Sequence, residues 1–185
     1  DQHVHSYYSF DSEQSIEGYI EKAISLDLSY LVLTDHYDLN YISSGKDLDF
    51  DINAQQKELD LLQVKYPNIK LLKGIEIGYV KSELNRISNI LSENHFDLVN
   101  YSVHEGGNID FYYPEQFKEH GIEKTLDLYF ETLLEALNAN VDFDVFCHFD
   151  YGFKTAYLAN NALKIRDFEE KIIPIFKKII ELDKT

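Results

Sequence analysis

The chain opens with two histidines, His3 and His5, that are separated by one residue. On an extended strand, residues at this spacing point to the same side, so both imidazoles can bind one metal ion. Asp1 shares that side of the predicted strand. By itself, this pair fits two ordinary polar strand residues as well as it fits a metal site.

Further imidazole and carboxylate side chains occur where short apolar runs end. Such runs end at His36, Glu76, His104 and His148. Any one of these histidines can be an ordinary core residue, provided that its ring has a hydrogen-bond partner. Together, however, five of the seven histidines and Glu76 mark the ends of five successive predicted strands. Solvated polar residues have no reason to keep this spacing, which therefore favours a shared metal centre.

The remaining carboxylates and histidines are harder to assign from their positions. Asp11 lies in a predicted loop, where an acidic residue commonly forms a turn or precedes a helix. Asp35 can either cap a following turn or bind a metal ion, whereas His36 beside it is better placed as a ligand. His95 and His120 do not follow predicted strands, and we expect both at the surface.

The combination of imidazole and carboxylate ligands without thiolates suits zinc, manganese or iron, and not a closed structural zinc site. Because the ligands outnumber the needs of one ion, we predict two or three divalent metal ions. Ions a few ångströms apart can clamp a phosphate group, polarise its bonds and activate a water molecule. The predicted chemistry is therefore phosphate ester hydrolysis.

The elements that must position these residues alternate between short apolar runs and longer amphipathic stretches. The apolar runs predict strands at residues 1–5, 30–33, 69–72, 96–99 and 143–147. The longer stretches predict helices at residues 15–24, 53–65, 81–92, 122–138 and 167–182. This alternation favours an α/β fold with a largely parallel sheet, either a barrel or an open layer. In both, reactive groups gather at the carboxyl ends of the strands.

Composition limits the size of the protein and its partners. A chain of 185 residues with 44% hydrophobic content can bury one substantial core, so we expect residues 1–185 to form a single domain. The net charge of −16 argues against nucleic-acid and membrane partners, and an anionic substrate then requires bound cations. Cys147 is the only cysteine, and no apolar run is long enough to span a membrane, so we expect a cytoplasmic protein.

An ordered series of motifs runs through nearly the whole chain. The motifs are His3-x-His5, Asp11, Thr34-Asp35-His36, Gly74-x-Glu76, Ser102-Val-His104 and His148-x-Asp150. This series resembles the polymerase-and-histidinol-phosphatase (PHP) domain family. Between the motifs, the sequence is most similar to that of the monofunctional histidinol-phosphate phosphatases in that family.

The resemblance implies a distorted (β/α)7 TIM-like barrel with three metal ions. It also implies catalytic roles for Asp11, His36 and Glu76, with Asp11 or His36 assisting proton transfer to the leaving alkoxide. The implied reaction converts L-histidinol phosphate, a small phosphomonoester, to L-histidinol and phosphate in histidine biosynthesis. The implied ligands are His3, His5 and Glu76 for the first ion, Glu76, His104 and His148 for the second, and Asp11 and His36 for the third.

Two features depart from the family pattern. Nothing after His148 matches the family's final Asp-x-His motif, and two βα units are missing. Because a barrel opened by two strands would expose unpaired edges, we expect a C-terminal truncation. A phosphate-binding arginine of the family is replaced by Lys154, which lacks the bidentate guanidinium. Two alternatives remain open: a PHP-type phosphoesterase or nuclease with another substrate, and a catalytically impaired metal-binding domain.

Overall fold

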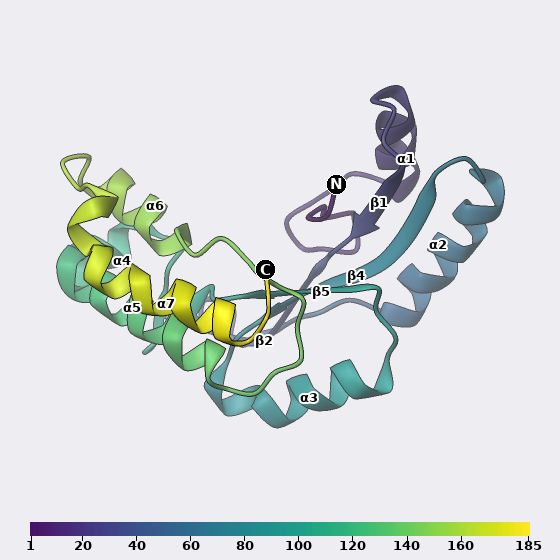
Figure 1. Ribbon diagram of the computed structural model, residues 1–185. Helices are drawn as coiled ribbons and strands as arrows, with labels where there is room; N and C mark the ends of the chain where they lie inside the picture. The colour runs from purple at the N-terminus through teal and green to yellow at the C-terminus, as the bar shows by residue number, and fades with distance from the viewer.

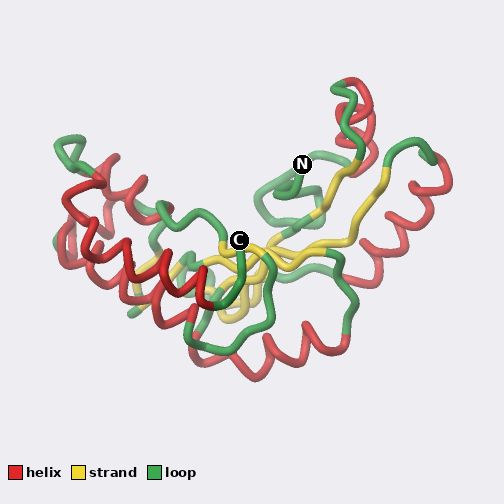
Figure 2. Tube along the Cα trace, in the orientation of Figure 1, coloured by secondary structure: helices red, strands yellow, loops and turns green.

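The computed structural model describes residues 1–185 and shows strands in the middle of the molecule with helices around them (Figures 1 and 2). The helices are α1 (Ile16–Ser25), α2 (Ile52–Lys65), α3 (Leu84–Glu93), α4 (Pro114–His120), α5 (Ile122–Leu137), α6 (Tyr151–Ala159) and α7 (Glu169–Glu181), with short 3-10 helices η1 (Lys81–Glu83) and η2 (Ile165–Phe168). The strands are β1 (Tyr30–Leu33), β2 (His36–Tyr41), β3 (Lys46–Leu48), β4 (Lys70–Gly78), β5 (Leu98–Ser102), β6 (Glu105–Gly106), β7 (Ile109–Asp110) and β8 (Val145–Phe146).

Strand β4 organises the main sheet, whose order is β3-β2-β4-β5-β8. On one side β4 pairs in parallel with β1 and then with β2, and on the other side with β5. The register places His36 of β2 opposite Glu76 of β4, and Glu76 opposite Asn100 of β5. Two predicted chemical groups from distant parts of the sequence are therefore neighbours at one edge of the sheet.

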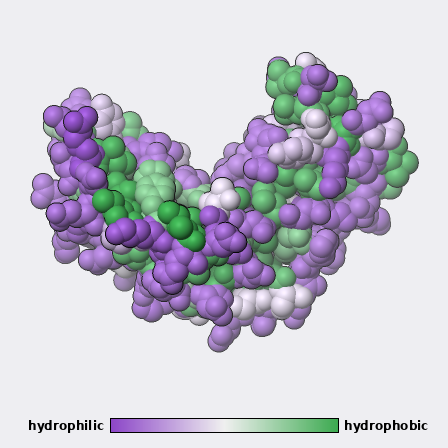
Figure 3. All heavy atoms as spheres, viewed as in Figure 1, coloured by the Kyte–Doolittle hydropathy of each residue, from purple (hydrophilic) through white to green (hydrophobic).

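Apolar side chains form separate clusters against different parts of the sheet. The largest contains 20 buried residues and packs α5 and α7 onto β4 and β5, with Tyr101, Tyr129 and Ile175 among its members. A second cluster of nine buried residues packs α1 onto β1 and includes Ile16 and Leu31. Figure 3 shows a largely hydrophilic surface with a hollow between helices α4 to α7 on one side and helices α1 and α2 on the other.

Local signals explain why the predicted helices form where they do. Ser15 caps α1 by accepting a hydrogen bond from the backbone N–H of Gly18 at 3.1 Å, and Asp51 caps α2 through Ala54 at 2.9 Å. All five predicted helices are present, although those predicted at 81–92 and 167–182 begin with the 3-10 turns η1 and η2. Helices α4 and α6 and the β6–β7 hairpin were not predicted. No helix combines the length and apolar character needed to cross a membrane.

The strand predictions required two corrections. Residues 1–5 do not form a strand, because the N–H of Val4 donates to the Thr34 side chain and interrupts a regular ladder. Two backbone hydrogen bonds nevertheless hold this segment beside β1. The second strand does not end at His36. β1 ends at Leu33, and His36 begins β2, which pairs with β4 in the same register as β1.

The predicted α/β class and largely parallel sheet are confirmed, since only β3 joins the main sheet in an antiparallel direction. The pairings form an open path from β3 to β8, so these residues do not close a ring of strands. On the free side of β8, the backbone of Thr185 hydrogen-bonds to Asp144 and Phe146. The parallel strands of the expected barrel are therefore present, but these residues do not form a closed barrel.

Gly74 allows β4 to approach β1 closely, and this contact can be tested. A Cβ at this position would lie 2.8 Å from the carbonyl oxygen of Leu33 and 2.7 Å from the Thr34 side chain. We expect Gly74→Ala to lower the free energy of unfolding by about 1–3 kcal/mol, because the backbone must shift to admit the methyl group. Urea unfolding measures the loss, and the exposed substitution Lys70→Ala on the same strand should change it by less than about 0.5 kcal/mol. Equal effects of the two substitutions would contradict this account.

Candidate metal centre

The carboxylate of Glu76 is the hub of the predicted site. It lies near the carboxyl end of β4 and is completely buried. Ser102 of the neighbouring strand donates a hydrogen bond to Oε1 at 2.5 Å. Five imidazoles surround it, with nitrogens at 3.0 Å for His3, 2.9 Å for His5, 3.4 Å for His36, 3.4 Å for His104 and 2.9 Å for His148.

Asp11 forms a second, more exposed contact point beside this hub. Its Oδ2 lies 3.0 Å from Nδ1 of His5 and 3.6 Å from Nε2 of His36, and Ser9 donates to its other oxygen at 2.6 Å. His5 and His36 therefore both face Asp11 and Glu76. The loop acid that was ambiguous in the sequence thus joins the histidine cluster.

Asp35 takes neither of the two roles left open for it, because it neither caps the following turn nor lies in a candidate ion group. Its buried carboxylate accepts hydrogen bonds from the backbone and hydroxyl of Ser6 and from the amide of Gln55 on α2. It belongs to none of the candidate ion positions. Its contacts fasten the segment after His5 to the start of β2, and this holds the first two histidines over the end of β4.

One buried carboxylate in the site was missed by the sequence analysis. Asp38 of β2 accepts hydrogen bonds from Nδ1 of His36 at 3.0 Å and from Nδ1 of His104 at 2.8 Å. The spacing of His36 and Asp38 puts both on one side of a strand, a signal that could have been found had β2 been predicted. His95 and His120 are exposed, as expected.

The carboxylates create a strongly negative potential around the imidazoles. Burial alone would lower the pKa of His3 and His5, but the neighbouring Cys147 and Glu76 for His3, and Asp11 and Glu76 for His5, raise each pKa to about 9. Burial opposes the charge on Glu76, yet the surrounding histidines hold its pKa well below the usual range. Such a site favours positive charge, and metal ions compete with protons for its nitrogens.

Three groups of side chains bring ligand atoms within 4.8 Å of one another. The donor set fits divalent cations, and one geometric detail supports this. Nε2 of His5 and Oε2 of Glu76 are 2.9 Å apart, yet both are buried without a hydrogen bond of proper geometry. A cation coordinated by both would satisfy them. The groups are His3, His5 and Glu76; His5, Asp11 and His36; and His36, Glu76 and His104.

All seven predicted metal ligands line one cavity of about 580 Å³, as does Lys154. Its other walls are largely aromatic, with Phe10, Tyr41 and Tyr151 among them. Lys154 extends from α6 with Nζ 5.1 Å from the centroid of the Tyr151 ring, and it is the only lysine or arginine in the lining. The cavity therefore combines candidate ion ligands, an apolar wall and one fixed positive charge.

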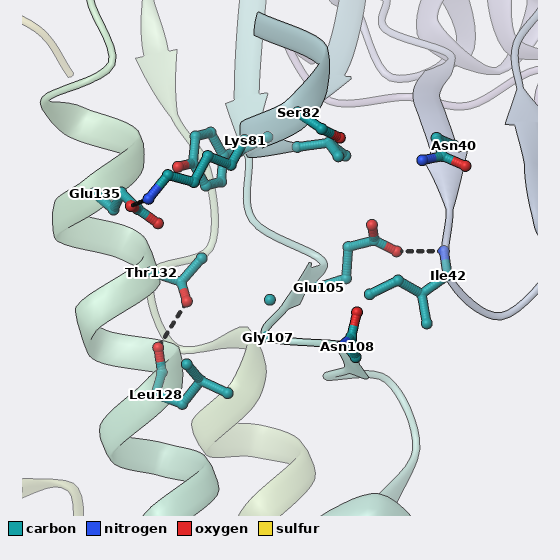
Figure 4. Close-up of a pocket in the computed structure, with 13 residues that line it drawn as sticks. Asn40, Ile42, Lys81, Ser82, Glu105, Gly107, Asn108, Leu128, Thr132 and Glu135 are labelled. Atoms are coloured by element: carbon teal, nitrogen blue, oxygen red, sulfur yellow. Dashed lines mark hydrogen bonds and ion pairs between the residues drawn. The ribbon is translucent and has the colours of Figure 1, made fainter.

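A second cavity of about 640 Å³ lies between the β6–β7 hairpin, α5 and the end of β2 (Figure 4). It contains the ion pair of Lys81 and Glu135, and no histidine lines it. Glu105 on its wall accepts a hydrogen bond from the backbone N–H of Ile42 at 2.7 Å. Candidate metal ligands therefore converge in the first cavity and not in this one.

The architecture agrees with the comparisons to known proteins. The PHP domain family matches residues 1–185, and the chain belongs to this family. A probable histidinol-phosphatase of Clostridium acetobutylicum is 29% identical over 181 residues, covering 98% of this chain and 69% of that protein. The histidinol-phosphatase of Lactococcus lactis is 26% identical over 187 residues, covering 100% and 69%.

A solved structure shares the fold. The crystal structure of histidinol phosphate phosphatase from Lactococcus lactis, complexed with zinc, L-histidinol and phosphate, superimposes with a TM-score of 0.83 at 23% identity. The match covers 100% of this chain and 70% of the other. At this level of identity the likeness establishes the common architecture.

Zinc binding at the Glu76 hub should stabilise the protein. At a free zinc concentration about 100 times the Kd, mass action adds about 3 kcal/mol to the free energy of unfolding. We expect Glu76→Gln to lose most of this gain, because the hub carboxylate is common to two of the candidate ion groups. Thermal unfolding with and without zinc measures this gain in stability. The exposed substitution Glu115→Gln on α4 is the control, and an undiminished gain in Glu76→Gln would refute the assignment.

Proposed function

We propose that this chain is a metal-dependent phosphomonoesterase that hydrolyses L-histidinol phosphate to L-histidinol and phosphate. The observation that carries the proposal is the convergence of five imidazoles on the buried carboxylate of Glu76 within one cavity. Relatives named for this activity match the chain over almost its whole length and support the choice of substrate. We further propose that residues 1–185 act as a single PHP domain.

We propose two or three divalent ions, with zinc as the first candidate because a structural relative is complexed with it. His3, His5 and Glu76 would hold the first ion, and Glu76, His104 and His148 the second. Asp11 and His36 would hold the third, an assignment that their contact with His5 supports. When bound, the ions would supply Lewis-acid stabilisation of the phosphate charge and a lowered pKa of water.

The protein's own side chains would position the substrate and assist proton transfer to its leaving group. Lys154 would meet a phosphate oxygen as a point charge at the cavity wall. Asp11 and His36 lie 3.6 Å apart beside the hub, and Asp11 is partly exposed. Because Nδ1 of His36 is engaged by Asp38, Asp11 would be the member of this pair that assists transfer of the attacking water's proton to the leaving alkoxide. The aromatic side chains Phe10, Tyr41 and Tyr151 would pack against the organic part of the substrate.

Phosphate release from L-histidinol phosphate tests the proposal directly. We expect the zinc-loaded full-length protein to release phosphate, and the double substitution His104→Ala, His148→Ala to abolish release because both imidazoles contact the hub. A substitution of both surface histidines, His95→Ala and His120→Ala, should leave the rate unchanged.

The same assay separates the alternative functions. Hydrolysis of a labelled oligonucleotide without hydrolysis of small phosphomonoesters would replace the proposal with a nuclease. Zinc binding without turnover of either substrate would favour a metal-binding domain that lacks catalysis. Either result would contradict the proposed phosphatase.

Lys154 should contribute mainly to substrate binding. Removal of a charge-assisted hydrogen bond costs about 1.5–3 kcal/mol, so Lys154→Ala should lower kcat/KM by about 10- to 100-fold, mostly through KM. Lys154→Arg should retain the activity, because guanidinium also binds phosphate. Steady-state kinetics with Lys164→Ala, an exposed lysine outside the cavity, provides the comparison. An unchanged KM in Lys154→Ala would remove this residue from the site.

A further inference from the structure

Asp38 has an unusual relation to the candidate metal centre, because its two oxygens serve two different histidines. Oδ2 accepts from Nδ1 of His36 at 3.0 Å, and Oδ1 accepts from Nδ1 of His104 at 2.8 Å. The residue is 2% exposed, so water does not compete for these bonds. His36 lies on the same strand, whereas His104 follows β5 on the far side of β4.

These bonds determine which nitrogen of each ring remains available. A neutral imidazole carries one N–H, and a carboxylate next to Nδ1 places the proton there and leaves the Nε2 lone pair free. Nε2 of His36 then faces Asp11 at 3.6 Å, and Nε2 of His104 faces Glu76 at 3.4 Å. Nδ1 of His36 also lies 3.4 Å from Glu76, but Asp38 is nearer.

The backbone around Asp38 is shaped to hold its carboxylate in place. Gly78 ends β4 directly beside it, and a Cβ on Gly78 would lie 2.0 Å from Oδ1 of Asp38. The segment after β2 is anchored by Glu105, which accepts a hydrogen bond from the N–H of Ile42 (Figure 4). It is also anchored by Asp110, which accepts a hydrogen bond from the hydroxyl of Ser43. The carboxylate thus occupies the space that a side chain at position 78 would need.

We propose that Asp38 is a positioning residue that sets the tautomer and orientation of His36 and His104 together, presenting Nε2 of both rings to the metal ions. This inference rests on the proposed metal-dependent function, but it concerns a residue that contacts the ligands and not the ions. One carboxylate thereby couples the second and third ion positions. Loss of that carboxylate disturbs both positions, although neither set of ligands is altered.

The substitution Asp38→Asn gives a sharp expectation. An asparagine amide has the same shape, but only its oxygen accepts hydrogen bonds, so one of the two Nδ1–H groups must lose its acceptor. We expect zinc affinity, measured by competition with a chelator, to fall by about 10- to 100-fold. Asp47→Asn on β3, a partly exposed carboxylate paired with Arg86, should leave zinc affinity unchanged.

The tautomers themselves can be observed by NMR of zinc-loaded protein labelled with 15N-histidine, since the chain has seven histidines. In the unsubstituted protein, His36 and His104 should both show a protonated Nδ1 and a zinc-bound Nε2. In Asp38→Asn, at least one ring should lose this pattern. Wild-type affinity together with two unchanged ring patterns in Asp38→Asn would overturn the proposal.

Gly78→Ala tests the same carboxylate without changing it. The added methyl group should displace Asp38 and weaken zinc binding in the same direction as Asp38→Asn, whereas Gly106→Ala, which crowds Thr132 instead, should not. Unchanged zinc affinity in Gly78→Ala would also count against the proposal. Because these measurements use zinc alone, zinc binding that depends on Asp38 would support the inference even without phosphatase activity, and a protein that binds no zinc would overturn both proposals.

Discussion

The structure depends on a buried carboxylate that cannot remain uncompensated. Glu76 is completely buried at the end of the central strand, and Asp38 is buried beside it, so neither can be hydrated. An isolated charge in such a place is very costly, and it persists only when positive charge or donors surround it. The five imidazoles around Glu76 meet this requirement as sources of N–H donors or as ligands of cations. Metal binding and the integrity of this end of the sheet are therefore two aspects of one electrostatic constraint.

The parallel sheet satisfies the constraint because its register brings distant residues to one edge. His36 and Asn100 flank Glu76 on the two neighbouring strands, while Ser102 reaches its carboxylate from β5. Glycine occurs in β4 where neighbouring groups need its space: Gly74 admits β1, and Gly78 admits the carboxylate of Asp38. The close approach of the strands and the geometry of the site thus have a common basis in β4.

The sequence could predict which groups converge, but not how they are held. Histidines recur where apolar runs end, which is the position of the carboxyl ends of parallel strands. His104 and His148 could therefore be predicted from the sequence. Asp38 could not be, because the polar and aromatic sequence of β2 lacks the apolar run by which the other strands were found. Helix α4 was missed since it has only seven residues, and the Asp1–His5 segment breaks its ladder through a side-chain contact that no local pattern encodes.

The acidic composition of the chain affects how the cavity can bind an anionic substrate. With a net charge of −16, the protein repels a phosphate ester at long range, and the candidate cavity contains one lysine against several carboxylates. Lys154 alone cannot reverse this sign. Each divalent ion bound at the hub adds two positive charges within the cavity, where low dielectric strengthens their effect. Bound ions would therefore strengthen the attraction of the cavity for an anionic substrate, which links metal loading to substrate binding as well as to chemistry.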